Sequence, residues 1–121
     1  MSITSQIKQD VPQRISQFPK LILGKPYFFH AWKKDRIGVE CLYYRFMGSD
    51  GKTQQRKKVP LKEIKAAVKR FQKKGIFDRS DYKKLCPTAL SSGPCGFAVI
   101  GRYLEFRHKA KYKGRGHGFS L

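Results

Sequence analysis

Basic side chains are concentrated in residues 52–74, in a pattern that could neutralise phosphate groups. This stretch holds ten Lys or Arg residues and one acid, Glu63, which is a net charge of +9 in 23 residues. With a period of 3.6, one side of a helix would carry Lys62, Lys65, Lys69 and Lys73, and a neighbouring side Leu61, Ile64, Val68 and Phe71. A helix that buries one side and exposes a cationic ridge on another is typical of proteins that bind a phosphate backbone.

A second basic surface is predicted just before this helix, on a small sheet. The alternation of a strand sends Arg56 and Lys58 to one side and Gln55 and Lys57 to the other. Arg and Gln can read base edges in the major groove, whereas Lys neutralises phosphates. An alternative is a single-strand or RNA platform with stacked bases, and a third reading places most of the aromatic residues in the core. The aromatic residues concerned are Tyr27, Phe29, Trp32, Tyr43 and Tyr44.

The composition of the whole chain supports a polyanionic partner. Its 121 residues include 27 basic and 8 acidic ones, a net charge of +19, and 40% hydrophobic residues, which is enough to build a core. Self-repulsion on this scale destabilises a compact fold unless a polyanion is bound. No apolar run approaches the roughly 18–20 residues of a membrane-spanning helix. Residues 1–10 lack the pattern of a secretory signal, so we expect a cytoplasmic, nucleoid-associated protein without a membrane partner.

The order of sequence patterns predicts an α+β fold. Residues 27–33, 37–47 and 53–59 are read as a three-stranded antiparallel meander, with a hairpin turn at Gly48–Gly51, packed on a helix at 60–74. Short helices and a basic C-terminal arm or wing follow. Asp78 is expected to cap a short helix, residues 88–94 to form a loop, and residues 95–107 to form a helix in preference to a strand. Residues 108–121 suit a flexible tail or a Gly-tipped hairpin.

Three segments are expected: an N-terminal helical or extended segment (1–24), one nucleic-acid-binding domain (25–107), and a basic Gly-rich tail or wing (108–121). The N-terminal segment has apolar residues at a spacing of about four, interrupted by Pro12. It could pack on the body of the chain or on a second copy, which permits a homodimer.

Two resemblances follow from these patterns. Residues 60–118 have the order helix, helix, helix, basic Gly-tipped segment, which resembles a winged helix-turn-helix, although 86–94 is longer than the usual turn. Residues 25–72, with the strings PYFFHAW, YYRF and DGKTQQRKKVPLKEI, resemble the sheet-plus-helix DNA-binding domains of phage integrases that bind arm-type sites. The second resemblance implies binding of double-stranded DNA through the sheet face and supplies no catalytic residues.

Metal-binding and catalytic chemistry have weaker signals. Cys86, Cys95, His108 and His117 are zinc-ligand types, but their spacings do not match paired ligands of a finger. Asp35 and Glu40 are the one acid pair near lysines that could suit a metal-dependent nuclease. We therefore expect no metal, no cofactor and no enzymatic activity.

The sequence thus predicts a double-stranded DNA-binding protein, either a small transcriptional regulator or an architectural protein. The alternatives are an RNA-binding or ribosome-associated protein and, more remotely, the nuclease. The residues predicted to contact nucleic acid are Arg45, Gln54, Gln55, Arg56, Lys57, Lys58, Lys62, Lys65, Lys69, Lys73, Arg102, Arg107, Lys109, Lys111, Lys113 and Arg115.

Overall fold

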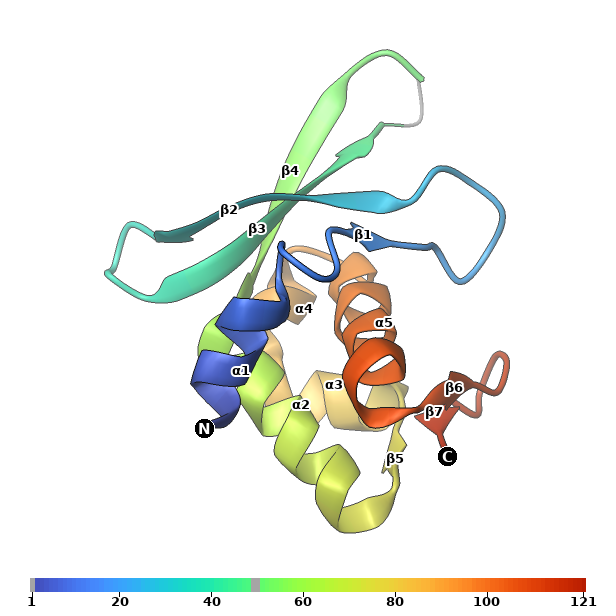
Figure 1. Ribbon diagram of the computed structural model, residues 1–121. Helices are drawn as coiled ribbons and strands as arrows, with labels where there is room; N and C mark the ends of the chain where they lie inside the picture. Colours follow the sequence, from blue (N-terminus) through green and yellow to red (C-terminus); the bar gives the residue numbers. More distant parts are fainter. Residues whose placement is uncertain (1, 49–50) are drawn as a thin grey trace.

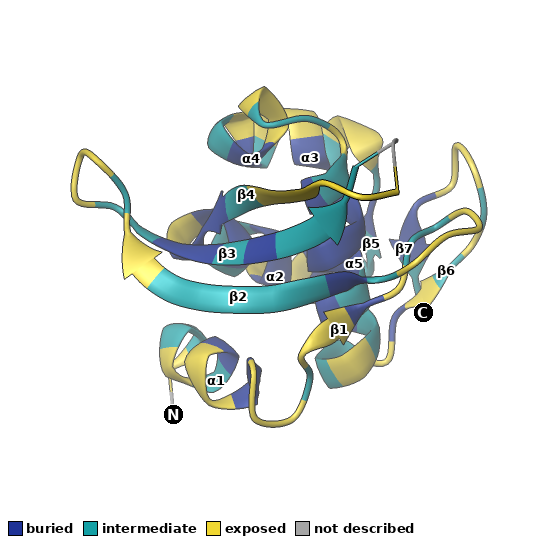
Figure 2. Cartoon of the chain, turned by 90° about the horizontal axis from the view of Figure 1, so that it is seen from above, coloured by how far each residue is buried: buried dark blue, intermediate teal, exposed yellow. Residues whose placement is uncertain are grey.

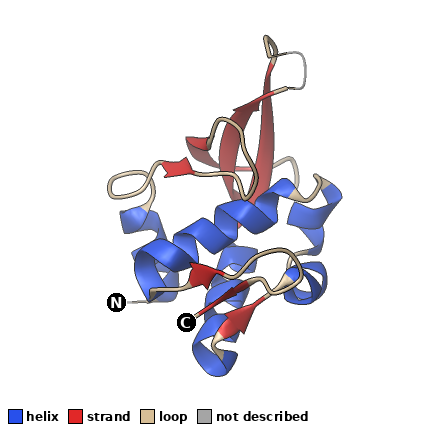
Figure 3. Ribbon diagram, turned by 90° about the vertical axis from the view of Figure 1, so that its right-hand side faces the viewer, coloured by secondary structure: helices blue, strands red, loops and turns tan. Residues whose placement is uncertain are grey.

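The computed structural model describes residues 2–48 and 51–121, and within them the fold is α+β (Figure 1). A four-stranded antiparallel sheet in the order β1-β2-β3-β4 lies over a layer of helices, and a small sheet in the order β5-β7-β6 lies at the other side of that layer (Figure 3). The strands of the larger sheet are β1 (Gln17–Phe18), β2 (Tyr27–Lys34), β3 (Glu40–Met47) and β4 (Gln54–Pro60).

The larger sheet confirms the three predicted strands and corrects their number. Gln17 and Phe18 pair with Phe28 and Tyr27 and add β1 as a fourth strand. A two-residue strand carries no readable alternation, and it forms because the Phe18 ring is fully buried while its backbone completes the edge of β2. At the predicted turn between β3 and β4, the Gly51 N–H donates to the Gly48 carbonyl at 3.0 Å, and Gly51 has the expected positive φ of 70°. Asp50, on which that prediction also relied, lies outside the described residues.

Helix α2 (Leu61–Lys74) follows β4 directly and lies under the sheet. The four apolar residues predicted to share one side are all buried, so the helical period is confirmed. Gly75 ends the helix in the left-handed conformation, with φ of 73°. The position of α2 fixes which lysines it turns outward.

The C-terminal half has the predicted order of elements, with one extra helix. The elements after α2 are β5 (Ile76–Phe77), α3 (Arg79–Leu85), α4 (Pro87–Ser91), α5 (Cys95–His108), β6 (Lys111–Tyr112) and β7 (Phe119–Ser120). Asp78 caps α3 as predicted, in a reciprocal pair with Asp81. The loop predicted at 88–94 is partly wrong, because Pro87 starts α4 and its next two N–H groups donate to the buried carboxylate of Glu63. The C-terminal residues form a hairpin rather than a tail.

Helix α5 is a buried central helix and not one of a set of short helices. It runs for 14 residues and buries side chains on most of its circumference. Gly101 is an unfavourable residue in a helix interior, and it has a packing reason: a Cβ there would lie 2.0 Å from the Phe119 ring. Glycine therefore lets β7 close against α5.

The N-terminal segment packs on the body of the same chain. Helix α1 (Ile3–Asp10) contacts α2, and Ile7, Val11 and Phe18 are buried in a core cluster that extends to Phe119. The cluster draws on all three segments named above, as the buried residues in Figure 2 illustrate. None of the helices in residues 2–48 and 51–121 is both long and apolar enough to cross a membrane.

Candidate nucleic-acid interface

All the helices lie on one side of the larger sheet, so the opposite side is open (Figures 1 and 3). The register places alternate residues of β2, β3 and β4 on that open side, because cross-strand partners share a face. We call this side the outer face. Its residues include Phe28, Ala31, Lys33, Tyr43, Arg45, Met47, Gln54, Arg56 and Lys58.

Two arginines lie directly opposite each other at the centre of the outer face. Arg45 in β3 is the register partner of Arg56 in β4. Like charges at facing positions of a sheet repel, which disfavours this arrangement in the absence of an anion. The Arg45 side chain is held in place by the Phe29 carbonyl, to which its Nη1 donates at 2.8 Å. Arg56 is exposed, so the pair presents a fixed and a free guanidinium side by side.

His30 lies within the positive electrostatic potential of this face. It lies at the irregularity in β2 where the register with β3 shifts between Phe29 and Ala31. Partial removal from water, and then the neighbouring charges of Arg56, Lys33 and Arg45, lower the pKa of His30 below its usual 6.5. The three cations that act on this histidine come from β2, β3 and β4, so the positive charge extends across the face.

Two aromatic rings of the outer face already contact cationic side chains. The Arg45 guanidinium lies 5.4 Å from the centre of the Phe28 ring, and Lys33 Nζ lies 4.8 Å from that of Tyr43. Both rings are half-buried. A base could stack on them only after the cations moved away, so this face as it stands suits phosphates better than bases.

The acids of the described residues are bound within the fold, which leaves most of the basic residues without a carboxylate. Asp10 binds Arg107, Asp35 binds Lys58, Glu40 binds Lys8, Glu63 binds backbone N–H groups of α4, Asp78 and Asp81 cap α3, and Glu105 binds Arg102. Asp35 also accepts from the backbone of Val39 and Ile37, and these bonds with that of Lys58 lower its pKa. The excess positive charge therefore lies on the surface.

Two of the predicted residues in β4 lie on the side of the sheet that faces the helices. Gln55 and Lys57 pair with Phe46 and Tyr44, which point toward the core. Lys57 Nζ lies 5.1 Å from the centre of the Phe46 ring and 3.7 Å from Cys95 Sγ. The alternation predicted for β4 is thus confirmed, and it separates Arg56 and Lys58 from Gln55 and Lys57.

The ridge of α2 begins beside the edge of the outer face. Lys58 and Lys62 border the same hollow, together with Asp35 and Thr88. From there Lys65, Lys69 and Lys73 follow at helical spacing, and Lys69 and Lys73 border a second hollow whose other walls include Arg70 and Lys74. The outer face and the ridge therefore adjoin at Lys58 and Lys62.

Arg102 and Arg107, predicted to contact nucleic acid from α5, are bound inside the molecule. Arg102 donates to the carbonyls of Pro19 and Lys20 and pairs with Glu105. Arg107 donates twice to the buried Asp10 carboxylate, at 2.6 and 2.9 Å. A recognition helix needs a free outer side, and here α1 and β1 occupy it. The winged-helix order of elements is therefore present without an exposed recognition helix.

The basic residues of the C-terminal hairpin form a separate surface. Lys109, Lys111, Lys113 and Arg115 lie in or next to β6 and the turn before β7, beside α5 and away from α1 (Figure 1). The structure therefore brings the predicted residues together in two groups, the outer face with the ridge, and the hairpin.

Sequence reasoning missed Phe28, His30 and Lys33 as parts of the basic face. Strand alternation over 27–34 could have placed Phe28 and His30 on one face, but Lys33 joins that face only because the register shifts between Phe29 and Ala31, which alternation does not predict. The other candidates are not assembled: within residues 2–48 and 51–121 no three His, Cys, Asp or Glu side chains gather as a metal site. Asp35 and Glu40, the acids weighed for a nuclease, bind lysines and backbone as described above.

No known protein family, no curated protein and no solved structure matches this chain.

Proposed function

We propose that this protein binds nucleic acid, with double-stranded DNA as the preferred form, through the outer face of its larger sheet. The observation that supports this most directly is the facing pair Arg45 and Arg56 on an uncovered sheet, with His30 and Lys33 beside it. Guanidinium groups bind phosphate oxygens in a bidentate manner, and a small sheet can lie in the major groove. A phosphate between the two arginines would remove their repulsion.

The ridge of α2 would extend the contact along the backbone. Because Lys58 and Lys62 border one hollow, a duplex on the outer face can continue past this edge toward Lys69 and Lys73. Gln54 and Arg56 are exposed residues of β4 that lie on the outer face and have side chains able to hydrogen-bond base edges. Base reading by these two would suit a regulator, and backbone contacts alone would suit an architectural protein. A location at the nucleoid follows only if duplex DNA is the partner.

An RNA or single-strand partner is the second candidate, and one observation favours it. Phe28 and Tyr43 lie on the same open face, where bases could stack if Arg45 and Lys33 moved to the phosphates. In that case binding would require a rearrangement of both cations.

A fluorescence anisotropy titration tests both candidates on the full chain. The probes are one labelled duplex, its single strand and a hairpin RNA of matched length, each at several salt concentrations. If about 6–10 phosphates are contacted, affinity for the duplex falls by about 10³–10⁵ between about 50 and 200 mM salt. The duplex is expected to bind more tightly than the other two.

The double variant Lys33→Glu and Arg56→Glu supplies the matched test of the surface. Both side chains are exposed, so the fold should tolerate the changes. The control is Lys83→Glu with Lys84→Glu, which reverses the same charge on exposed residues of α3. Equal losses of affinity in the two variants, or a nearly flat salt dependence of the parent protein, would refute binding at the outer face.

A further inference from the structure

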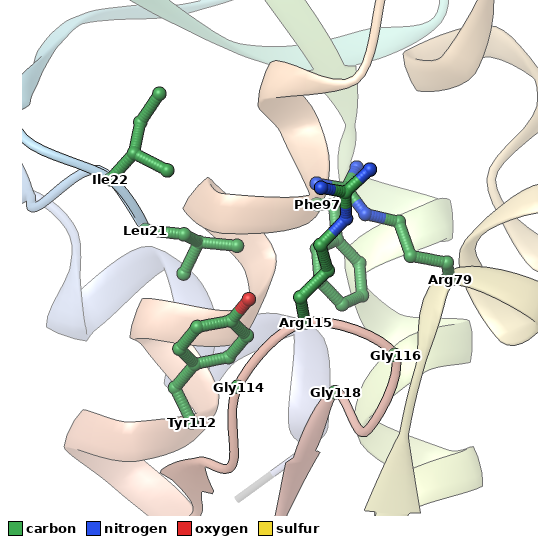
Figure 4. A pocket seen from close by; sticks show the side chains of 9 residues that line it. All are labelled: Leu21, Ile22, Arg79, Phe97, Tyr112, Gly114, Arg115, Gly116 and Gly118. Atoms are coloured by element: carbon green, nitrogen blue, oxygen red, sulfur yellow. The ribbon is translucent and has the colours of Figure 1, made fainter.

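A pocket of about 600 Å³ lies away from the sheet, between the connector after β1, the start of α3 and the turn of the C-terminal hairpin (Figure 4). Six side chains form most of its wall: Leu21, Ile22, Arg79, Phe97, Tyr112 and Arg115. The remaining wall is backbone of three glycines in the hairpin turn. Its volume lies within the range of about 300–1,000 Å³ that is usual for small-molecule sites.

Two arginines converge on this pocket from separate elements. Arg79 starts α3; its guanidinium lies 4.4 Å from the centre of the Phe97 ring and donates to the Pro94 carbonyl at 3.3 Å. Arg115 lies on the hairpin turn, and in Figure 4 both guanidinium groups point toward the same part of the pocket. Among the described residues that line the pocket none is acidic. Two cations without a carboxylate form a site for an anion, and their planar donors match a phosphate group.

The other walls are apolar and aromatic. The Tyr112 ring is fixed by the Phe119 ring, 5.2 Å away, and turns its edge and hydroxyl toward the pocket. Leu21 and Ile22 line the opposite wall, and Ile22 is 81% exposed although it is a large apolar residue. An adjoining hollow of about 200 Å³ shares Leu21, Ile22 and Arg79 with the pocket. A ligand with a phosphate and a flat organic part would use both kinds of wall.

The fold itself sets the distance between the two arginines. Gly118 is buried and has a φ of 65°, and a Cβ at this residue would lie 2.5 Å from the Phe77 carbonyl oxygen and 2.7 Å from Asp78 Cα. Only glycine lets the hairpin close so tightly against the start of α3. Because this contact lies next to Arg79 in the chain, it holds the turn that carries Arg115 over the same pocket.

We propose that this pocket binds a nucleotide, with Arg79 and Arg115 on its phosphate and with Tyr112, Leu21 and Ile22 against its base and sugar. The ligand is either a free mononucleotide or the 5′-phosphorylated end of a strand, because both present the same group. This site is separate from the outer face of the sheet and does not depend on duplex binding there.

The test is a calorimetric titration of the full chain with AMP, adenosine and inorganic phosphate. AMP is expected to bind more tightly than either of the other two, because it alone engages both walls. Arg115→Ala should weaken AMP binding by about tenfold or more, the loss of one charge-assisted contact. Lys113→Ala is the matched control: it removes a charge two residues away on the same hairpin, from an exposed residue that does not line the pocket.

Three results would overturn the proposal. Adenosine that binds as tightly as AMP would exclude a role for the arginines, and inorganic phosphate that binds as tightly would exclude one for the apolar wall. Equal losses in Arg115→Ala and Lys113→Ala would indicate general charge attraction. Since Arg115 is exposed, thermal unfolding should show that both variants keep the parent fold.

The source of the nucleotide is decided by a second pair of probes. One oligonucleotide with a 5′-phosphate is compared with the same oligonucleotide ending in a hydroxyl, in the parent and in Arg115→Ala. A preference for the phosphate that Arg115→Ala abolishes assigns the pocket to strand ends, and AMP binding without that preference assigns it to free nucleotides. Absence of both AMP binding and this preference refutes the site. Arg56→Glu should leave the affinity for AMP and the preference for the 5′-phosphate unchanged, so failure here is distinct from failure of the outer face.

Discussion

The outer face of the sheet and helix α5 both carry arginines, but the fold uses them in opposite ways. Arg56 is exposed on an open surface opposite Arg45. In contrast, Arg102 binds the Glu105 carboxylate and two backbone carbonyls, and Arg107 binds the buried Asp10 carboxylate. The Asp10 carboxylate that holds Arg107 comes from 97 residues earlier in the chain. An arginine is therefore left at the surface or bound within the fold according to whether acceptors from other parts of the chain reach it.

The difference matters for the charge of the whole molecule. The described carboxylates cap helices, accept buried hydrogen bonds or form ion pairs. Few of them therefore lie beside the basic residues of the outer face and the ridge. Lys58 is the exception, since Asp35 pairs with it at 3.0 Å. Apart from Asp35 and Glu40, the described acids belong to the helical layer, which leaves the sheet surface cationic.

The largest expected effect is on the closed region, at Asp10. Its carboxylate is 1% exposed and accepts from Tyr103 and twice from Arg107, so Asp10→Ala leaves a partly buried guanidinium unpaired. We expect a loss of about 3 kcal/mol in the free energy of unfolding, measured by urea denaturation. Lys8 lies on the same helix as Asp10 and forms a half-exposed pair with Glu40 of β3. Lys8→Ala should therefore lower the free energy of unfolding by less than about 1 kcal/mol. A similar small loss for Asp10→Ala would show that the N-terminal segment does not hold α5.

The dependence of stability on pH tests the same contacts of Asp10. Burial acts to raise the pKa of Asp10, but the bonds from Arg107 and Tyr103 outweigh it and hold the pKa below 3.8. The folded-state pKa is thus lower than the unfolded one, so this stabilisation is complete above the unfolded pKa and is lost as the pH falls through the folded one. Asp10→Asn should lack that part of the acid-induced loss, which parallel denaturation series from neutral pH to about pH 3 would detect.

A pair of single variants then separates the two regions. Arg56→Glu should weaken duplex binding by about tenfold or more at moderate salt and change stability by less than about 0.5 kcal/mol. Arg102→Ala should lower the free energy of unfolding by about 1 kcal/mol, because it removes bonds to the Pro19 and Lys20 carbonyls. Its affinity for the duplex should stay within about twofold of that of the parent protein.

Anisotropy and urea denaturation on both proteins supply the four values. If Arg102→Ala instead lost duplex affinity and kept its stability, α5 would be a recognition helix after all, and the contrast drawn here between an open sheet and a closed helix would fail.

Local periodicity explains why much of the fold could be predicted and why part of the site could not. The buried stripe of α2, the cap at Asp78 and the faces of β4 depend on neighbours within a few residues, and each was readable from the sequence. The fourth strand, the enclosure of α5 and the partners of Arg102 and Arg107 depend on contacts between residues far apart in the chain. Side-chain type alone cannot tell an arginine that binds a ligand from one that binds Asp10.

The smallest expected effect is on His30, at the centre of the outer face. Partial removal from water, and then three neighbouring cations, hold its pKa below 6.5 in the free protein, and bound phosphates would neutralise those cations. The pKa of His30 should therefore rise when duplex DNA binds, as NMR titration of its ring protons would show. By linkage, a proton is taken up on binding and duplex affinity increases as the pH falls through this range. A His30 pKa that stays constant while DNA saturates the protein would place the duplex elsewhere, because a polyanion on Arg45 and Arg56 would change the field at this neighbouring histidine of β2.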